Sequence, residues 1–211
     1  MTTEYPYAIE LKDITKTFGA VAANEGVTMD LRRGEILALL GENGSGKTTL
    51  VNMLAGIYFP DSGEISVNGQ VATIRSPKDA FALGIGMVHQ HLRLVDVLTA
   101  AENIVLGLPG GIQLKKKELT RRICEIADKY GFDIDPDKKI YDMSIGEKQT
   151  VEIMKVLYRG ANILILDEPT AVLTPQETER LFAVLRRMKE DGKSIIIITH
   201  KLNEVLAISD R

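Results

Sequence analysis

The 211-residue chain has one cysteine, no tryptophan and no apolar run near the roughly 18 residues that a membrane-spanning helix needs. The single cysteine, Cys124, excludes a disulfide within the chain and is typical of proteins from a reducing compartment. The N-terminus also lacks the basic-then-apolar order of a secretory signal peptide. These absences predict a soluble protein that takes part in a membrane process only through a partner.

No charge of one sign dominates the chain. Its 26 basic and 29 acidic residues give a net charge of −3, which argues against a surface devoted to nucleic acid. Apolar residues make up 45% of the chain, enough to fill the core of one large domain or of a core with a subdomain.

A glycine-rich segment has the pattern G-x-x-x-x-G-K-[ST] of a phosphate-binding loop. Its residues are Gly41, Glu42, Asn43, Gly44, Ser45, Gly46, Lys47 and Thr48. Residues 35–40 before it predict a buried strand, and residues 49–55 after it predict a helix. This context favours a nucleotide site over an ordinary glycine-rich turn, the alternative interpretation. Lys47 is then expected to reach the β- and γ-phosphates, and Thr48 to hold Mg²⁺.

The strand and helix patterns predict an α/β fold. Alternation in residues 7–18 and a strand at 64–67 before the Asn68-Gly69 turn indicate an N-terminal antiparallel β layer. Further apolar runs alternate with helical patterns, which indicates a mostly parallel sheet flanked by helices. These runs lie at 36–40, 85–88, 163–166 and 195–199. Residues 92–158 show helical periodicity and no convincing strand, so we expect a helical subdomain there.

Polar residues follow three of the predicted parallel strands. Asp167 and Glu168 follow the strand at 163–166, Gln90 follows the strand at 85–88, and His200 follows the last strand. Because parallel strands end at one edge of a sheet, these groups are expected near a bound nucleotide. Asp167 would hold Mg²⁺, Glu168 would polarise the attacking water, and His200 would contact the γ-phosphate. An acidic turn and a solvated histidine are the alternatives.

Two other polar patterns are ambiguous on their own. Ser144-Ile145-Gly146-Glu147 has the spacing of a capping box, and the start of the helix that it predicts could be either a plain cap or an anion site. His89 and His91 flank Gln90, but no third residue at useful spacing completes a metal site.

Taken in order, these motifs resemble the nucleotide-binding domain of ABC transporters over nearly the whole chain. By position, residues 41–48 match the Walker A motif, and Thr49 belongs to the same nucleotide-binding set. The other matches are Gln90 to the Q-loop, Ser144, Gly146, Glu147 and Gln149 to the signature, Asp167 and Glu168 to the Walker B aspartate and catalytic glutamate, residues 171–174 to the D-loop, His200 to the switch histidine, and Phe18 to the aromatic that stacks on adenine.

This resemblance implies ATP and Mg²⁺ as cofactors, with Lys47, Gln90, Glu168 and His200 in catalysis. Mg²⁺ would be held by Thr48, Gln90 and Asp167. It also implies a P-loop core with a RecA-like fold at 1–91 and 159–211, which includes the antiparallel layer. The helical subdomain at 92–158 completes the domain, and the natural protein would continue past Arg211 into further β structure.

The departures from the family pattern narrow the resemblance. Met143-Ser144-Ile145-Gly146-Glu147 stands for the usual LSGGQ, and Thr174 stands where the D-loop often has aspartate. Both variants resemble the motifs found in importers of simple sugars and nucleosides. Those proteins often fuse two ATPase halves. The expected partners are a second ATPase domain paired head to tail, a transmembrane permease and, indirectly, an extracytoplasmic solute-binding protein. The expected location is the cytoplasmic face of the membrane. Nucleic acid is not expected as a partner.

Three other classes of protein share the phosphate-binding loop. A soluble ABC-type ATPase of translation or DNA repair would have the same nucleotide motifs, but it usually carries basic linkers or long coiled-coil insertions, and neither is present in the sequence. A GTPase would need an N-K-x-D motif, which the sequence lacks, and a nucleotide kinase would not need Ser144, Gly146 or His200.

Overall fold

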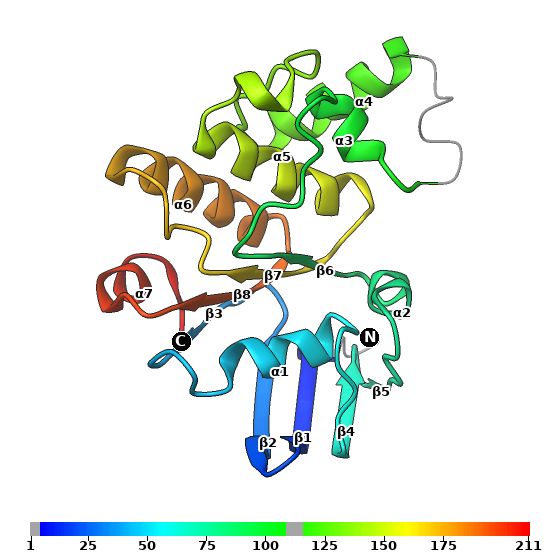
Figure 1. Ribbon diagram of the computed structural model, residues 1–211, viewed down its shortest axis with the longest axis vertical. Coiled ribbons are helices and arrows are strands. Elements are labelled where there is room, and N and C mark those ends of the chain that lie inside the picture. Colours follow the sequence, from blue (N-terminus) through cyan, green and yellow to red (C-terminus); the bar gives the residue numbers. More distant parts are fainter. Residues whose placement is uncertain (1–4, 109–115) are drawn as a thin grey trace.

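The computed structural model describes residues 5–108 and 116–211 and arranges them in layers. Figure 1 shows a parallel sheet across the middle of the molecule, an antiparallel sheet on one side of it and a group of helices on the other. The α/β class expected from the sequence, with an antiparallel layer and a mostly parallel sheet, is confirmed.

The antiparallel sheet has the strand order β2-β1-β4-β5. Its strands are β1 (Tyr7–Phe18), β2 (Val21–Arg32), β4 (Ser62–Val67) and β5 (Gln70–Val71). Asn68 and Gly69 join the last two strands with φ values of 53° and 80°, which suit a tight hairpin turn. The expected strand at 64–67 and its turn are therefore present.

Strand β1 does not keep one face inward along its whole length. Ile9, Leu11 and Ile14 are buried, but Phe18 is 44% exposed. The pairing of β1 with β2 shifts register after Leu11, and Asp13 has a φ of 51°. These irregularities break the alternation of period two, so Phe18 does not join the core as the apolar pattern suggests.

The central sheet is parallel throughout, with the order β3-β8-β7-β6. Its strands are β3 (Ile36–Leu40), β6 (Ile85–Val88), β7 (Ile163–Asp167) and β8 (Ser194–Thr199). In β7, Ile163 and Ile165 pack in the core shared with β1, whereas Leu164 and Leu166 pack against helices on the other face. Burial on both faces explains why these strands are apolar at nearly every position, apart from polar residues at the ends of β7 and β8.

Helices cover the parallel sheet on both sides (Figure 1). On the side of the antiparallel sheet lies α1 (Lys47–Leu54), with α2 (Pro77–Ala82) leading into β6. The other face is covered by α6 (Pro175–Glu190), and α7 (Leu202–Ile208) lies at the edge near β3. The main chain of Asp210 and Arg211 also hydrogen-bonds to β3.

The helices α3 (Ala100–Val105), α4 (Lys116–Tyr130) and α5 (Ile145–Tyr158) pack around a separate apolar cluster, with a 3₁₀ turn at Ile140–Asp142. In the described part of residues 92–158 no strand joins either sheet; residues 109–115 lie outside that part. This cluster supports the helical subdomain, whose boundaries stay a proposal. No helix in the described ranges has the length and apolar character needed to cross a membrane.

Candidate functional site

The loop between β3 and α1 leaves the start of α1 free of any side-chain cap. The N-cap residue, Gly46, has a φ of 85°, and among the described residues no side chain accepts a hydrogen bond from the first turn. A Cβ at Gly46 would lie 2.2 Å from the carbonyl oxygen of Ala23. Glycine is therefore required both by the backbone conformation and by the close approach of β2. The first-turn N–H groups are left for an anionic ligand.

A cavity lies in front of this helix start. Its lining combines the loop, the beginning of β2 and the ends of two parallel strands: Val21, Ala22, Ala23, Asn43, Gly44, Gly46, Lys47, Thr48, Thr49, Gln90, Asp167 and Glu168. Gly41, Glu42 and Ser45 belong to the same loop but do not line the cavity. The sequence therefore predicted most of this lining, and the contribution of β2 is new.

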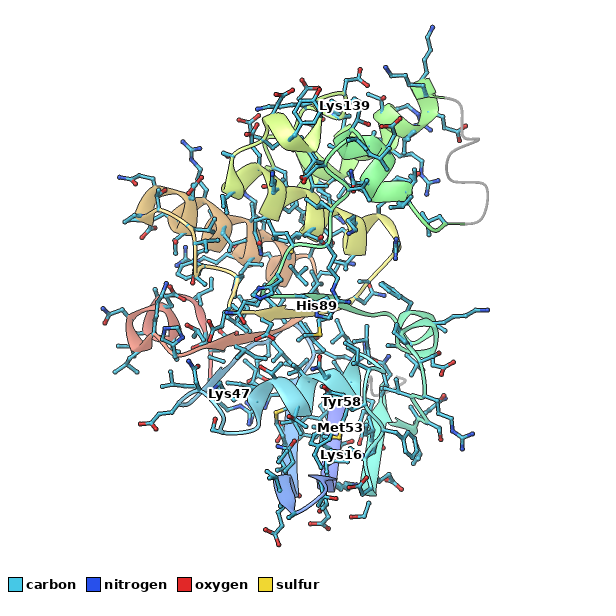
Figure 2. All side chains as sticks on the ribbon, viewed as in Figure 1. Lys16, Lys47, Met53, Tyr58, His89 and Lys139 are labelled. Carbon is cyan, nitrogen blue, oxygen red and sulfur yellow. The ribbon has the colours of Figure 1, made fainter. Side chains whose placement is uncertain are left out.

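Lys47 keeps its ammonium group close to the loop. Its Nζ donates to the carbonyl oxygens of Gly41 at 2.8 Å and Glu42 at 2.7 Å, and to Ser45 Oγ at 3.3 Å. Figure 2 shows Lys47 at the N-terminal end of α1. A positive charge and a helix N-terminus thus act together at the phosphate-binding loop.

Asp167, the last residue of β7, is a buried carboxylate that lines the cavity. Burial, and then the negative charge of Glu168, raise the pKa of Asp167, while the Thr48 hydroxyl and the Lys47 charge lower it. A buried carboxylate beside a hydroxyl is the oxygen donor set that suits Mg²⁺. Thr48 and Asp167 therefore fit the expected metal.

Glu168 brings together the three strand ends that the sequence predicted. Gln90 Nε2 donates to Glu168 Oε2 at 3.2 Å, and His200 Nδ1 lies 3.1 Å from Glu168 Oε1. Glu168 has a φ of 46°, which is unusual for a residue other than glycine. Such a backbone is often found where a side chain is aimed at a functional site.

Phe18 lies next to the cavity without lining it. It pairs with Val21 across the β1–β2 hairpin, and Val21 is part of the lining. The ring is partly exposed and packs against Tyr58 with 5.1 Å between ring centroids.

Ser144, Gly146 and Glu147 line a different cavity, between α5 and α6. The Ser144 side chain accepts from the Glu147 N–H at 3.2 Å, and Glu147 Oε2 accepts from the Ser144 N–H at 2.7 Å. The expected helix start and its capping box are therefore present. None of these three residues lines the cavity at the phosphate-binding loop.

Glu177, which the sequence analysis missed, approaches the same helix start. A Cβ at Gly146 would lie 2.5 Å from Glu177 Oε1. The other oxygen, Oε2, accepts from the Thr174 N–H and hydroxyl, both at 2.9 Å. The T-x-x-E spacing of these two residues is a second capping-box pattern that could have predicted the start of α6.

His89 lies in a third cavity, between α2, β6 and α5, and is labelled in Figure 2. Burial is the main cause that lowers its pKa. Charged groups surround this cavity: Glu152 Oε1 accepts from the Arg93 N–H at 2.6 Å, and Lys155 Nζ donates to the Arg93 carbonyl at 3.0 Å. The segment after Gln90 is thereby fixed to α5.

Comparison with known proteins gives a consistent result. The family model described as ABC transporter matches residues 24–171. The chain is 52% identical over 205 residues to the nucleoside import ATP-binding protein NupA of Lactococcus lactis, which covers 96% of this chain and 40% of the relative. It is 50% identical over 207 residues to the guanosine import ATP-binding protein NupO of Bacillus subtilis, covering 97% and 41%. The chain thus spans about two fifths of the length of these relatives.

Solved structures share the fold. The ADP conformation of MJ1267, an ATP-binding cassette of an ABC transporter, matches with a TM-score of 0.86 and 27% identity, covering 97% of this chain and 85% of the other. The dimeric structure of MJ0796, a bacterial ABC transporter cassette, matches with a TM-score of 0.79 and 26% identity, covering 93% and 89%.

Proposed function

The chain belongs to the ABC transporter family, and we propose that it binds Mg-ATP, hydrolyses it and thereby powers the import of a nucleoside or simple sugar. The observation that carries this proposal is the cavity in which an uncapped helix start meets Asp167 and Glu168. One part of it binds phosphate, and the other supplies the carboxylates that hydrolysis requires.

We propose that the nucleotide lies along the cavity with its base near Phe18. The N–H groups of the loop and of the start of α1 would surround the phosphates, from residues 41–49. Lys47 would leave its loop carbonyls to contact the β- and γ-phosphates. The oxygens of Thr48, Gln90 and Asp167 would hold Mg²⁺, which supplies charge neutralisation on the phosphates when it is bound.

Hydrolysis breaks the bond between the γ-phosphorus and the bridging oxygen while a water oxygen bonds to phosphorus. Glu168 would accept the hydrogen bond and then the proton of this water. Gln90 and His200 already contact the two oxygens of Glu168 and would orient the carboxylate. His200 would then turn its ring toward the γ-phosphate.

The assignment of Glu168 can be tested with Glu168→Gln, which keeps the shape and removes the base. We expect Mg-ATP affinity within about twofold of wild type, and turnover in the complex with the permease at least about 100-fold lower. Glu179→Gln, a change of an exposed carboxylate on α6, is the matched control and should leave both unchanged. Unchanged turnover in Glu168→Gln would remove Glu168 from the role of base.

We further propose that Ser144, Gly146 and Glu147 contact the nucleotide of a second ATPase domain. The dimeric cassette MJ0796, a structural relative, supports such pairing. The separation of α5 from the phosphate-binding loop in one chain supports it as well, because each helix start then serves a different nucleotide.

The permease would bind at the cavity around His89 and Arg93, next to Gln90, and would place the chain at the cytoplasmic face of the membrane. The names of the relatives support nucleoside transport as the first substrate class to test. In vesicles containing the permease and its solute-binding protein, uptake of a nucleoside should require ATP and stop in Glu168→Gln. ATPase stimulation by ribosomes or DNA, rather than by the permease, would contradict this proposal.

A further inference from the structure

The ring of Phe18 is held by groups from two separate segments. Tyr58, in the loop after α1, packs against it at an interplanar angle of 71°. From β1 itself, Lys16 Nζ lies over the ring, 5.5 Å from its centroid. Aromatic and cation–π contacts of this kind restrain a ring that would otherwise sample several rotamers at a surface.

Asp61 connects these two segments. Its Oδ1 accepts from Lys16 Nζ at 2.6 Å, and its Oδ2 accepts from the Thr17 N–H at 2.7 Å and the Thr17 hydroxyl at 2.8 Å. Its own N–H donates to the carbonyl of Thr15 at 2.8 Å. The Lys16 ammonium, followed by the Thr17 N–H and hydroxyl, lowers the pKa of Asp61 to about 2, so the carboxylate is ionised at neutral pH.

The loop that carries Tyr58 is fixed in turn to the helix that begins at the phosphate-binding loop. The N–H groups of Ile57 and Tyr58 donate to the carbonyl of Asn52, in the last turns of α1, at 2.8 Å and 3.2 Å. Figure 2 shows Lys47 at the first residue of α1 and Tyr58 near the other end of this helix. One continuous set of contacts therefore runs from the start of α1 to the ring of Phe18.

We propose that Tyr58 and Asp61 are positioning residues that hold the Phe18 ring at a fixed place relative to the phosphate-binding loop, and so determine how much the nucleobase adds to nucleotide affinity. The inference rests on the proposed nucleotide site. A ring that is already in place loses little freedom when a base stacks on it, so more of the stacking energy appears as affinity.

This proposal predicts a lower affinity for ATP and an unchanged affinity for tripolyphosphate, whereas an ordinary loss of stability would lower both affinities. Inorganic tripolyphosphate contains the phosphate chain without the base, and it needs only the phosphate-binding loop. The ratio of ATP affinity to tripolyphosphate affinity therefore measures the contribution of the adenosine part, and a change of this ratio at the Phe18 ring reports the contribution of the base. We expect Tyr58→Leu and Asp61→Asn to lower this ratio about three- to tenfold and to leave tripolyphosphate binding unchanged.

Matched variants test whether the fall in the affinity ratio comes from the contacts of Tyr58 and Asp61. Tyr58→Phe keeps the ring and should keep the wild-type ratio. Phe59→Leu removes a neighbouring exposed ring that lies near Arg75 instead, and should also keep it. Asp79→Asn changes a carboxylate that likewise accepts from a main-chain N–H and a hydroxyl, at the start of α2, and is the control for Asp61→Asn.

Calorimetric titration of the 211-residue chain with both ligands gives the ratio for each variant. The proposal is overturned if Tyr58→Leu keeps the wild-type preference for ATP, or if ATP and tripolyphosphate affinities fall by the same factor. It is also overturned if Phe59→Leu lowers the ratio as much as Tyr58→Leu does. A wild-type chain that binds neither ligand would instead overturn the proposed nucleotide site itself, and the inference with it.

Discussion

The starts of α1 and α5 are both helix N-termini at which the sequence suggested an anion site, with a plain cap as the alternative at α5, and their N–H groups are satisfied in different ways. At α1 the N-cap is Gly46, and no side chain in the described part of the chain accepts a hydrogen bond from the first turn. At α5 the N-cap is Ser144, and a complete capping box is formed with Glu147. A helix start without its own acceptor is suited to a ligand, whereas one with a capping box is stable without any.

The acidic groups beside the two helix starts have pKa values that are shifted in opposite directions. At α1 the pKa of Asp167 is raised by burial and by Glu168, so the fold disfavours its ionised form. At α5 the pKa of Glu147 is lowered, chiefly by Lys138, and that of Glu177 is lowered, chiefly by the Thr174 N–H. Glu147 thus has an ion-pair partner in Lys138 at 2.6 Å, whereas the Lys47 ammonium at α1 donates to loop oxygens and offsets only part of the effect of burial on Asp167. This comparison predicts that changes at α1 alter nucleotide binding and that changes at α5 alter stability and pairing.

The largest effect should come from Gly46→Ala. Alanine is strained at a φ of 85°, and its Cβ would meet the Ala23 carbonyl. We expect Mg-ATP affinity to fall at least about 100-fold, because the loop must move to relieve the contact. Gly44→Ala is the control: its φ is 84°, but apart from its two chain neighbours no described residue has a heavy atom within 4 Å of the added Cβ. Its Mg-ATP affinity should fall about tenfold, which is the cost of the backbone conformation alone. Equal losses in calorimetric titration would contradict the role given to the Ala23 contact.

Asp167→Asn should separate metal binding from folding. The gain in ATP affinity on adding Mg²⁺ should fall about 10- to 100-fold, while affinity without Mg²⁺ should not fall. Since the folded-state pKa of Asp167 is raised, the carboxylate makes the ligand-free chain less stable as pH rises through that pKa. Asp167→Asn should therefore raise the melting temperature of the ligand-free chain at pH 7.

At the start of α5, Glu177→Gln should change the melting temperature in the direction opposite to Asp167→Asn. The folded-state pKa of Glu177 is lowered, so its contribution to stability is present above the unfolded-state pKa and is lost as pH falls through the folded-state value. The variant should lower the melting temperature at pH 7 without changing Mg-ATP affinity. Shifts of the same sign in Asp167→Asn and Glu177→Gln would break the contrast between the two helix starts.

Gly146→Ala tests the contact between α5 and α6 directly. The added Cβ would lie 2.5 Å from Glu177 Oε1, so the carboxylate must turn away and lose its hydrogen bonds from Thr174, and we expect a loss of about 1 kcal/mol in the free energy of unfolding. Removing the obstructing carboxylate in Gly146→Ala/Glu177→Ala should recover part of this loss, which a double-mutant cycle by urea denaturation would show. Additive losses would mean that the two residues do not interact.

Much of this fold was predictable because the strands of the parallel sheet are buried on both faces. Apolar runs at 36–40 and 85–88 coincide with β3 and β6. Strand β2 was not predicted, since Asn24 and Glu25 precede Gly26, which has a φ of 59°, in the middle of it. The helix expected at 49–55 begins two residues earlier, because Gly46 acts as N-cap and leaves Lys47 already helical.

The candidate site was predictable where residues follow one another along the chain or follow strand ends. The loop motif and the order of Gln90, Glu168 and His200 are local signals whose convergence follows from a parallel sheet. Asp61 contacts Thr17, and Glu177 contacts the start of α5. In each case the two segments are far apart in the sequence, and no repeating pattern of apolar residues predicts that they meet. These contacts depend on how loops pack after the sheets have formed, so only the structure shows them.

The smallest effect should come from Ser144→Ala, which removes the N-cap of α5. We expect a loss of about 1 kcal/mol in the free energy of unfolding, and a similar loss for Thr174→Ala, which removes the matching cap of α6. Neither change should alter Mg-ATP affinity of the single chain, because neither residue lines the cavity at α1. If α5 serves the nucleotide of a second domain, only Ser144→Ala should also lower turnover in the complex with the permease. A loss of ATP affinity in the single Ser144→Ala chain comparable to that of Gly46→Ala would show that both helix starts act on one nucleotide, and the distinction between them would fail.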